Sequence, residues 1–407
     1  LTLHKGLAKG PAREQAKILL DEVGIRDPQA AMNAFPHEFS GGMRQRVMIN
    51  EPTLLIADEP TTALDVTIQA QILKLIADLQ TKRDIGVLFI SHDLAVVSDI
   101  ADQIVVMEKG KVVESGQPKT IFENPQHPYT QKLLAAIPSG QKAADAVAPD
   151  PLIRIEHLRT WFTPTTGAEP VKAVDDVSLE IHRGEVLGLV GESGSGKSTL
   201  GRSILRLVPI TDGRITFEGT ELSALEGRAL KQFRHRMQMI FQDPYASLNP
   251  RMTVYDTLAE PLLLHGLVNK AGLDQAIREL MDNVGLARAF VRKYPHEFSG
   301  GQRQRIAIGR ALTTRPEFIV ADEPVSALDV TIQAQILDLL ANLTKEYGLT
   351  MLFISHDLAV IRQIADRIAV MYHGKLVEEG STVKVFDNPQ QDYTRSLLAA
   401  IPGTNAA

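Results

Sequence analysis

Apolar and polar residues alternate along the second part of the chain in a way that predicts a sheet covered by helices. Short apolar runs predict strands at residues 152–162, 177–181, 185–190, 214–217, 237–241, 318–321 and 351–354. Apolar positions three and four apart predict helices at residues 273–284, from about residue 301, at 330–343 and at 358–364. Residues 254–294 are mostly helical in pattern and form an inserted block between Gln242 and Ser299. Strands alternating with helices indicate an α/β fold with a mixed sheet.

The pattern occurs twice in the chain. Residues 36–46 recur as 295–305 with few differences, and residues 63–73 match 327–337 without a difference. The end segments 124–130 and 133–138 are echoed by 388–394 and 397–402. We infer two copies of one domain.

The copies differ in length. Glu59 and His92 precede Glu323 and His356 by the same interval, whereas the interval between Ser40 and Ser299 is five residues shorter. Copy one therefore lacks five residues between Arg46 and Pro52, where copy two reads as a continuous helix. Five residues are about 1.4 helical turns. We expect this loss to misplace either the segment at Ser40 or the strand at residues 54–57, and copy one to be poorly stable by itself.

Copy one also lacks a counterpart of residues 152–261, because Leu1 aligns with about Leu262. We expect an incomplete first copy at residues 1–138, a linker at 139–151, a complete second copy at 152–388 and a tail at 389–407. The linker is rich in Ala, Pro, Asp and Gln. Because the first residue is Leu, we also expect that the sequence begins inside a longer reading frame.

Composition excludes several classes of protein. The chain has 407 residues, 44% of them hydrophobic, which is enough for two or three ordinary domains. There is no apolar run near eighteen residues and no signal-peptide pattern, so we expect a protein that neither spans a membrane nor leaves the cytosol. The absence of cysteine excludes disulfides and thiolate metal sites, and the net charge of −6 argues against a nucleic-acid partner.

One glycine-rich stretch in copy two has the sequence of a phosphate-binding loop. It fits G-x-x-x-x-G-K-[ST], follows the apolar run 185–190 and opens a helical segment, flanks that disfavour an ordinary glycine-rich turn. The loop comprises Gly191, Glu192, Ser193, Gly194, Ser195, Gly196, Lys197, Ser198 and Thr199. Its backbone N–H groups and the following helix start would bind phosphates. Lys197 would reach the β- and γ-phosphates, and Ser198 would bind Mg²⁺ through its oxygen.

Further polar residues follow the other predicted strands. Asp322 and Glu323 end the run 318–321, where one carboxylate can hold magnesium and the next can polarise an attacking water. We expect His356 to contact the γ-phosphate and Gln242 to act as a ligand-sensing hinge. Taken singly, they could be a salt-bridged pair, a structural histidine and a surface amide. The recurrence of the carboxylate pair and the histidine in copy one favours function.

A serine followed by two glycines opens a helix in each copy. The residues are Ser299, Gly300, Gly301 and Gln302 in copy two and Ser40, Gly41, Gly42 and Met43 in copy one. Alone this is a helix start with a serine cap. At a fixed distance before the carboxylate pair, it predicts a second phosphate-binding helix terminus.

Together these motifs resemble those of the ATP-binding cassette (ABC) ATPases, and the resemblance covers nearly the whole chain. It rests on the phosphate loop, Gln242, residues 299–302, Asp322 with Glu323, residues 326–329 and His356, in this order. Phe162 stands where that family has an adenine-stacking aromatic residue. The tails resemble those of the oligopeptide, dipeptide and nickel importers, and the fused pair is similar to glutathione and microcin-type peptide importers.

The resemblance implies an ATPase that energises peptide import, with ATP and Mg²⁺ as cofactors. Implied magnesium ligands are Ser198, Gln242 and Asp322, and implied catalytic residues are Glu323, His356 and Lys197. Because cassettes of this family stack head to tail, Ser40, Gly41 and Gly42 would close the site of copy two, with Met43 replacing the usual glutamine. The second signature, residues 299–302, would face no phosphate loop in this chain.

The resemblance also implies partners and a location. The partners are two transmembrane permease subunits and an external substrate-binding protein, with dimerisation through a further cassette as an option. Residues 242–250 would pass the state of the site to the permeases, at the cytoplasmic face of the bacterial inner membrane.

Two other interpretations stay open. A truncated product could bind ATP through copy two without driving transport, which the missing front of copy one favours. A cassette ATPase acting in translation or DNA repair is disfavoured, because the chain has neither a long coiled-coil insertion nor a charged linker between its copies.

Overall fold

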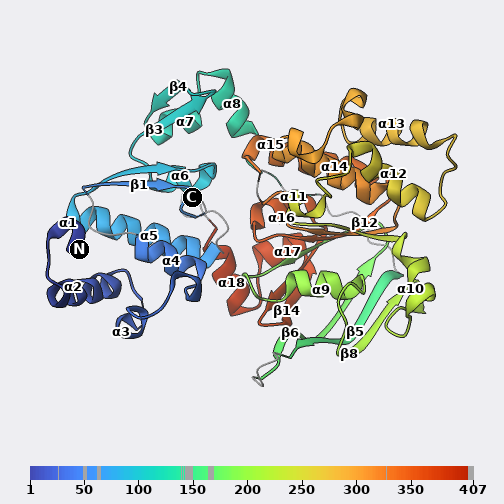
Figure 1. The fold of residues 1–407 in the computed structure, drawn as a ribbon, viewed down its shortest axis with the longest axis horizontal. Helices are drawn as coiled ribbons and strands as arrows, with labels where there is room; N and C mark the ends of the chain where they lie inside the picture. Colours follow the sequence, from blue (N-terminus) through green and yellow to red (C-terminus); the bar gives the residue numbers. More distant parts are fainter. Residues whose placement is uncertain are drawn as a thin grey trace. The chain divides into compact units, whose positions relative to one another are not determined.

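The computed structural model describes residues 1–25, 27–48, 53–61, 66–138, 140, 142, 150–163, 169–326 and 328–401. It divides into two compact units, Leu1–Leu134 and Ala135–Ile401 (Figure 1). Most of the expected linker at residues 139–151, part of the expected gap between Arg46 and Pro52, and Ala327 lie outside the described residues.

The larger unit is built on a six-stranded sheet in the order β10-β11-β12-β7-β13-β14. The first five strands in this order are parallel, and β14 is antiparallel to β13. The bounds are β7 Val186–Val190, β10 Met237–Ile240, β11 Phe318–Asp322, β12 Thr350–Ile354, β13 Arg367–Tyr372 and β14 Lys375–Ser381. Every residue of β7, β11 and β12 is buried, because both faces of the sheet are covered. These strands therefore read as continuous apolar runs.

Two hydrophobic cores lie on opposite faces of this sheet. Val186 and Val190 of β7 belong to one core, and Leu187 and Leu189 belong to the other, as alternation along a strand requires. The first core contains the helical block, and the second contains α9 and an antiparallel sheet of order β6-β5-β8-β9. The antiparallel strands are β5 Pro151–Phe162, β6 Val171–His182, β8 Asp212–Phe217 and β9 Thr220–Glu221.

The helices of the larger unit follow the predicted order, including the inserted block. They are α9 Lys197–Ile204, α10 Gly227–Arg234, α11 Pro244–Ser247, α12 Val254–Leu264, α13 Leu273–Asn283, η2 Arg288–Arg292, η3 Pro295–Glu297, α14 Gly300–Leu312, α15 Val330–Tyr347, α16 Leu358–Ile364, α17 Thr382–Asp387 and α18 Asp392–Ala399. The strand prediction missed β13 and β14 altogether, and it missed the start of β6, which lies at Val171 rather than at residue 177. Pairing with β5 extends it, since Val171 stands opposite Phe162.

The smaller unit contains two separate two-stranded sheets. β1 (Leu54–Asp58) and β2 (Gly86–Ile90) are parallel, and β3 (Ile104–Glu108) and β4 (Lys111–Gly116) are antiparallel. They correspond to β11–β12 and β13–β14, which β7 joins in the larger unit. Among the described residues of the smaller unit there is no strand equivalent to β7, so its two pairs are not joined. Its helices are α1 Thr2–Lys5, α2 Lys9–Glu22, α3 Pro28–Ala31, η1 Pro36–Glu38, α4 Gly41–Met48, α5 Val66–Arg83, α6 Leu94–Ile100, α7 Pro118–Glu123 and α8 Pro128–Ala135, the last of which ends at the unit boundary.

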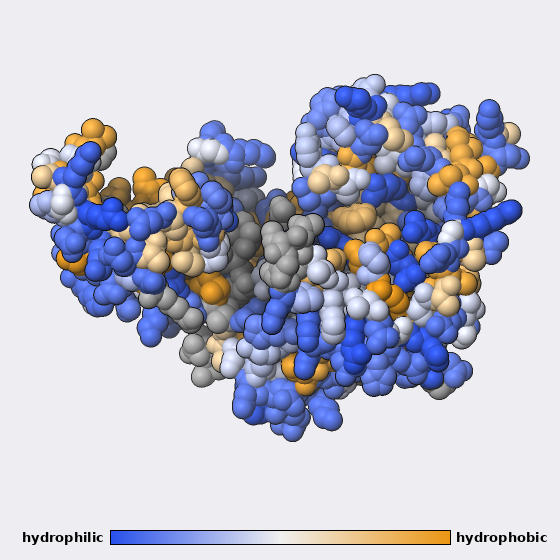
Figure 2. Space-filling view, turned by 60° about the horizontal axis from the view of Figure 1, so that its bottom comes forward, coloured by the Kyte–Doolittle hydropathy of each residue, from blue (hydrophilic) through white to orange (hydrophobic). Residues whose placement is uncertain are grey.

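One face of the β1–β2 pair is apolar and exposed. Leu54, Ile56, Leu88 and Ile90 are 44–60% exposed, whereas their counterparts Phe318, Val320, Leu352 and Ile354 are all 0% exposed. In the larger unit this face packs into the core that contains α9. Figure 2 shows hydrophobic side chains, in orange, at the surface of the smaller unit on the left of the view.

The five missing residues do not displace the elements that flank them, which corrects our expectation. β1 pairs with β2 in the register of β11 with β12, from Leu54 opposite Gly86 to Asp58 opposite Ile90. A Cβ on Gly42 would meet the Cγ2 of Ile68 at 2.6 Å, and one on Gly301 would meet the Cγ2 of Ile332 at 2.3 Å, so both signature helices pack closely on the next helix.

An arginine contact also recurs across the gap. Arg46 donates to Gln71 Oε1 at 2.6 Å, and its counterpart Arg305 donates to Gln335 Oε1 at 3.3 Å. The described part of α4 has 8 residues, against 13 in α14. The described start of α4 therefore keeps the contacts that the start of α14 makes.

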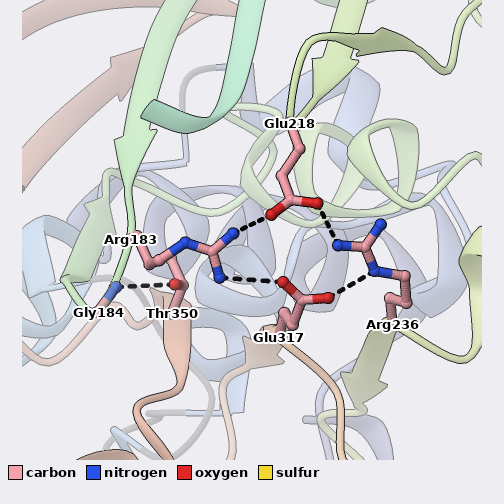
Figure 3. Close-up of polar contacts among 6 residues, drawn as sticks. All are labelled: Arg183, Gly184, Glu218, Arg236, Glu317 and Thr350. Atoms are coloured by element: carbon pink, nitrogen blue, oxygen red, sulfur yellow. Dashed lines mark hydrogen bonds and ion pairs between the residues drawn. The ribbon is translucent and has the colours of Figure 1, made fainter. Parts of the chain in front are cut away.

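A ring of four charged side chains lies at the amino ends of the parallel strands (Figure 3). Arg183 bonds Glu218 and, at 3.0 Å, Glu317, while Arg236 bonds the same two carboxylates. Arg183 precedes β7, Arg236 precedes β10 and Glu317 precedes β11, whereas Glu218 follows β8. The ring thus fixes the antiparallel sheet to the ends of the strands that are remote from the phosphate loop.

Candidate nucleotide-binding site

The predicted site residues of the larger unit gather at the carboxyl ends of four neighbouring strands. The phosphate loop follows β7, Gln242 follows β10, Asp322 ends β11 with Glu323 directly after it, and His356 follows β12. These strands are adjacent in the order β10-β11-β12-β7. Open α/β sheets bind ligands at this edge.

The loop has the backbone shape that its glycines allow. Gly191 has a φ of 147°, and a Cβ at this position would lie 2.2 Å from the carbonyl oxygen of Met371. The loop leads into α9, whose first residue, Lys197, is buried. Lys197 Nζ donates to the carbonyl oxygens of Gly191 at 2.7 Å and Glu192 at 2.8 Å. The ammonium group is therefore held inside the loop, where a phosphate would attract it.

Ser198 and Asp322 meet beside the loop. Ser198 Oγ donates to Asp322 Oδ1 at 2.8 Å, and Arg202, one turn further along α9, lies 3.7 Å from Asp322 Oδ2. Burial raises the pKa of Asp322, against the opposing effects of the Ser198 hydrogen bond and the Arg202 charge. Asp322 Oδ2 and Ser195 Oγ are buried and accept no hydrogen bond from the described residues. A hard cation or a phosphate would satisfy such oxygen donors and acceptors.

Glu323 is the centre of a second contact group. Gln242 Nε2 donates to Glu323 Oε2 at 2.8 Å, and His356 Nδ1 lies 3.2 Å from Glu323 Oε1. Burial acts to raise the pKa of Glu323, but the hydrogen bond and charge of His356 outweigh it and lower that pKa. Conversely, burial acts to lower the pKa of His356, and Glu323 raises it. Each group therefore favours the charged form of the other, as in an ion pair.

The same carboxylate and histidine meet in the smaller unit. His92 Nδ1 lies 3.1 Å from Glu59 Oε1. Glu59 and Glu323 also share a positive φ, 44° and 46°, which is uncommon for a residue with a side chain. The local geometry of this pair thus does not depend on a neighbouring phosphate loop.

The remaining predicted residues stand on other elements. Phe162 ends β5 and is half-exposed, and Ser299 caps α14, where it accepts a bond from Gln302 N and Gln302 Oε1 accepts one from Ser299 N. In the smaller unit Ser40 Oγ accepts a bond from Met43 N at 3.3 Å, but methionine has no oxygen to accept the reciprocal bond.

Three residues that contact the site or the segment after Gln242 were missed by the sequence analysis. Arg202 faces Asp322, Arg310 on α14 donates to the carbonyl of Ser247 at 2.6 Å, and Tyr393 on α18 bonds the phosphate loop. Their contacts join segments distant in sequence. A usable signal existed for Tyr393, since the tails repeat it as Tyr129.

A separate groove of about 990 Å³ lies on the antiparallel sheet, away from the phosphate loop. Its charged lining is mostly self-paired, for example Arg154 with Glu180 and Arg214 with Glu221. We assign it no role in the site.

The fold and the loop define an α/β nucleotide-binding protein of the phosphate-loop class. The family model "ABC transporter" matches residues 174–326. The model "Oligopeptide/dipeptide transporter, C-terminal region" matches twice, at residues 113–156 and 377–407. The second model thus finds the repeat of the tails.

Curated relatives match almost the whole chain. The peptidoglycan transport ATP-binding protein of Agrobacterium fabrum is 47% identical over 98% of this chain and 75% of its own length. The glutathione import ATP-binding protein of Escherichia coli K12 is 48% identical over 99% of this chain and 70% of its own length.

Solved structures match over somewhat more than half of the chain. The ATP-binding cassette MJ0796, in a dimeric post-hydrolysis state bound to ADP and Pi, has a TM-score of 0.52 and 29% identity over 56% of this chain and 98% of its own. The protein cbiO1 of Clostridium perfringens, part of the ABC transporter complex cbiONQ, has a TM-score of 0.51 and 26% identity over 59% of this chain and 92% of its own.

The chain belongs to the ABC transporter family and carries an ATP-binding ATPase cassette of that family. Among the described residues, the structure contains no helix of the length and apolarity needed to cross a membrane.

Proposed function

We propose that this protein is the ATP-hydrolysing subunit of a bacterial importer of peptides. The observation that carries the proposal is the convergence of Lys197, Ser198, Asp322 and the Glu323 contact group on one edge of the sheet. The cargo class follows from the relatives, which are named for peptidoglycan and glutathione transport, and from the two importer-type tails. An oligopeptide, a dipeptide or a glutathione-like peptide fits both.

ATP would bind through the loop residues 191–199. Lys197 would exchange its two carbonyl partners for the β- and γ-phosphates, and Phe162 would stack on the adenine. Ser198, Asp322 and Gln242 would hold Mg²⁺ with oxygen atoms, and the buried, unsatisfied Asp322 Oδ2 supports this fit. When bound, the ion neutralises phosphate charge.

Glu323 would orient and deprotonate the attacking water. Its lowered pKa keeps it ionised at neutral pH, as a proton acceptor requires. Gln242 and His356 each contact one of its oxygens and would hold the carboxylate in place, while its remaining lone-pair sites can accept a bond from a water. His356 would also stabilise charge on the γ-phosphate.

We further propose that residues 1–138 are a first cassette without a phosphate loop, joined by residues 139–151 to a complete cassette at 152–388 with a tail at 389–407. Ser40, Gly41 and Gly42 would close the ATP site of the second cassette, from the same chain or from another. Residues 299–302 would be free to serve a further cassette. The partners would be two permease subunits and an external substrate-binding protein, at the cytoplasmic face of the inner membrane.

The test is ATP hydrolysis by the purified chain. Lys197→Ala and Glu323→Gln should each lower kcat by about 10²–10⁴-fold, and Glu59→Gln, the matched change in the smaller unit, should leave it within about twofold. A rate first order in protein supports closure within one chain, and a steeper dependence supports closure between chains. ATP binding without hydrolysis above the Glu323→Gln background would overturn the proposal and favour a remnant that only binds ATP.

A further inference from the structure

The C-terminal tail contacts the phosphate loop directly. The backbone N–H of Glu192, the second residue of the loop, donates to Tyr393 Oη at 3.0 Å. Tyr393 lies in the first turn of α18, inside the second match to the importer C-terminal region. The contact joins residues 201 positions apart.

The ring of Tyr393 is fixed by the same turn that supports the loop. It packs on Tyr372 with a centroid distance of 4.2 Å. Tyr372 ends β13, and the turn that follows places Gly374 N 2.9 Å from the carbonyl oxygen of Ser195, to which it donates. The carbonyl of Met371 also lies against Gly191. Tyr393 and the loop thus share one rigid support.

The start of α18 is anchored by a carboxylate. Glu378 on β14 accepts hydrogen bonds from Gln390 N at 2.7 Å and Gln391 N at 3.1 Å. Burial opposes ionisation of Glu378, but these bonds lower its pKa and hold the carboxylate form. The segment before Tyr393 is therefore immobilised, and the tyrosine hydroxyl has little freedom to leave Glu192.

The repeat supplies an internal comparison. Glu114 accepts equivalent bonds from Gln126 N at 2.8 Å and His127 N at 3.1 Å, and Tyr129 stands at the position of Tyr393. Within the described residues of the smaller unit there is no phosphate loop for Tyr129 to contact. The anchoring of the tail is therefore common to both copies, whereas the bond to a loop belongs to Tyr393.

We propose that Tyr393 is a positioning residue of the nucleotide site, whose hydroxyl holds the start of the phosphate loop in the conformation that binds phosphate. The inference rests on the proposed binding of ATP at this loop. A loop that is already ordered pays less entropy when ligand binds, and apparent affinity falls with the fraction of molecules in the competent conformation. A single neutral hydrogen bond of this kind predicts a change of about two- to tenfold in affinity.

The test uses the full chain and Tyr393→Phe, which removes the hydroxyl and keeps the ring on Tyr372. Equilibrium binding of the fluorescent analogue mant-ATP with Mg²⁺ should weaken about two- to tenfold, and the KM for ATP should rise by the same factor with kcat within about twofold. Tyr129→Phe is the matched control and should change neither value. An unchanged Kd in Tyr393→Phe, or an equal change in Tyr129→Phe, would overturn the proposal.

Hydrogen exchange without nucleotide separates this inference from the proposed function. In Tyr393→Phe, the amides of residues 193–199 should exchange faster, at an unchanged melting temperature, and in Tyr129→Phe they should not. If the wild-type chain failed to bind mant-ATP, the proposed function would fall while the exchange result still tested the contact. Unchanged exchange in Tyr393→Phe would show that the hydroxyl does not order the loop.

Discussion

His356 and Glu323 form a partly buried ion pair in which Nδ1 lies 3.2 Å from Oε1. The pair raises the pKa of His356 above its ordinary 6.5 and lowers that of Glu323 below its ordinary 4.5. The histidine contribution to stability is complete below pH 6.5 and is lost as pH rises through the folded-state pKa. The glutamate contribution is complete above pH 4.5 and is lost as pH falls through the folded-state pKa. The nucleotide-free protein therefore gains most from the pair between these two values.

Glu323→Gln should lower the pKa of His356, because it removes the negative charge and leaves the burial that disfavours the imidazolium. The measurement is an NMR titration of the His356 ring protons in the nucleotide-free chain. Glu59→Gln, the same change in the smaller unit, should leave the His356 titration where it was. A His356 pKa that is the same in wild type and Glu323→Gln would contradict the assignment of its cause.

Leu88 and Leu352 occupy matched positions on β2 and β12 but differ completely in burial, 51% against 0% exposed. Leu352→Ala should destabilise the larger unit by about 2–5 kcal/mol, because it leaves a cavity in a closed core. Leu88→Ala should cost the smaller unit less than about 1 kcal/mol. Hydrogen exchange resolved by peptide measures the free energy of unfolding of each unit separately, which is needed because a chain of two units does not unfold in one step. Equal costs would mean that the β2 face is covered in solution.

Glu317 bonds both arginines of the charge ring. These bonds lower the pKa of Glu317, with the bond to Arg236 contributing most, against the opposing effect of burial. Its contribution to stability is present above its ordinary pKa of 4.5 and is lost as pH falls through the folded-state value. Glu317→Gln should therefore destabilise the larger unit by about 1 kcal/mol at pH 7, since the ring is partly exposed and screened. The difference from wild type should shrink in acid and in high salt.

The control for this change is Glu226→Gln, at an exposed glutamate before α10, which should alter stability little at any pH. Melting temperatures of both variants, recorded from pH 7 down to below pH 4.5, give the comparison. A Glu317→Gln deficit that persists unchanged in acid would mean that packing rather than charge holds the ring.

Three of the strands that were predicted are buried along their whole length. β7, β11 and β12 are covered on both faces, so each is a continuous apolar run in the sequence. The first six residues of β6 were missed because they are held by pairing with β5 rather than by burial of an apolar run. A strand segment that is held by backbone pairing alone shows no periodic pattern of apolar residues in the sequence.

The candidate site was predictable where a motif fixes backbone geometry. Gln242, Asp322, Glu323 and His356 stand at or just after strand ends, Lys197 and Ser198 open α9 after the phosphate loop, and the sheet order brings them together. Arg202 and Tyr393 were missed because they belong to no motif at a strand end. Arg202 reaches the site from α9, and Tyr393 reaches it from the C-terminal tail. The effect of the five-residue gap was mispredicted because helix rotation was considered without the contacts of Gly42 and Arg46, which hold the helix start in place.

Met43 leaves one capping bond unmade at the start of α4. In α14, Gln302 Oε1 accepts from Ser299 N at 3.1 Å, completing the reciprocal pair of bonds. Met43→Gln should supply this bond and stabilise the smaller unit by about 0.5–1 kcal/mol, and Gln302→Met should cost the larger unit a similar amount. Slower hydrogen exchange at residues 40–48 in Met43→Gln, with faster exchange at 299–307 in Gln302→Met, is the expected result. The two helix starts otherwise share their contacts. If Gln302→Met destabilised its helix but Met43→Gln stabilised nothing, methionine at residue 43 would stabilise its helix by packing instead.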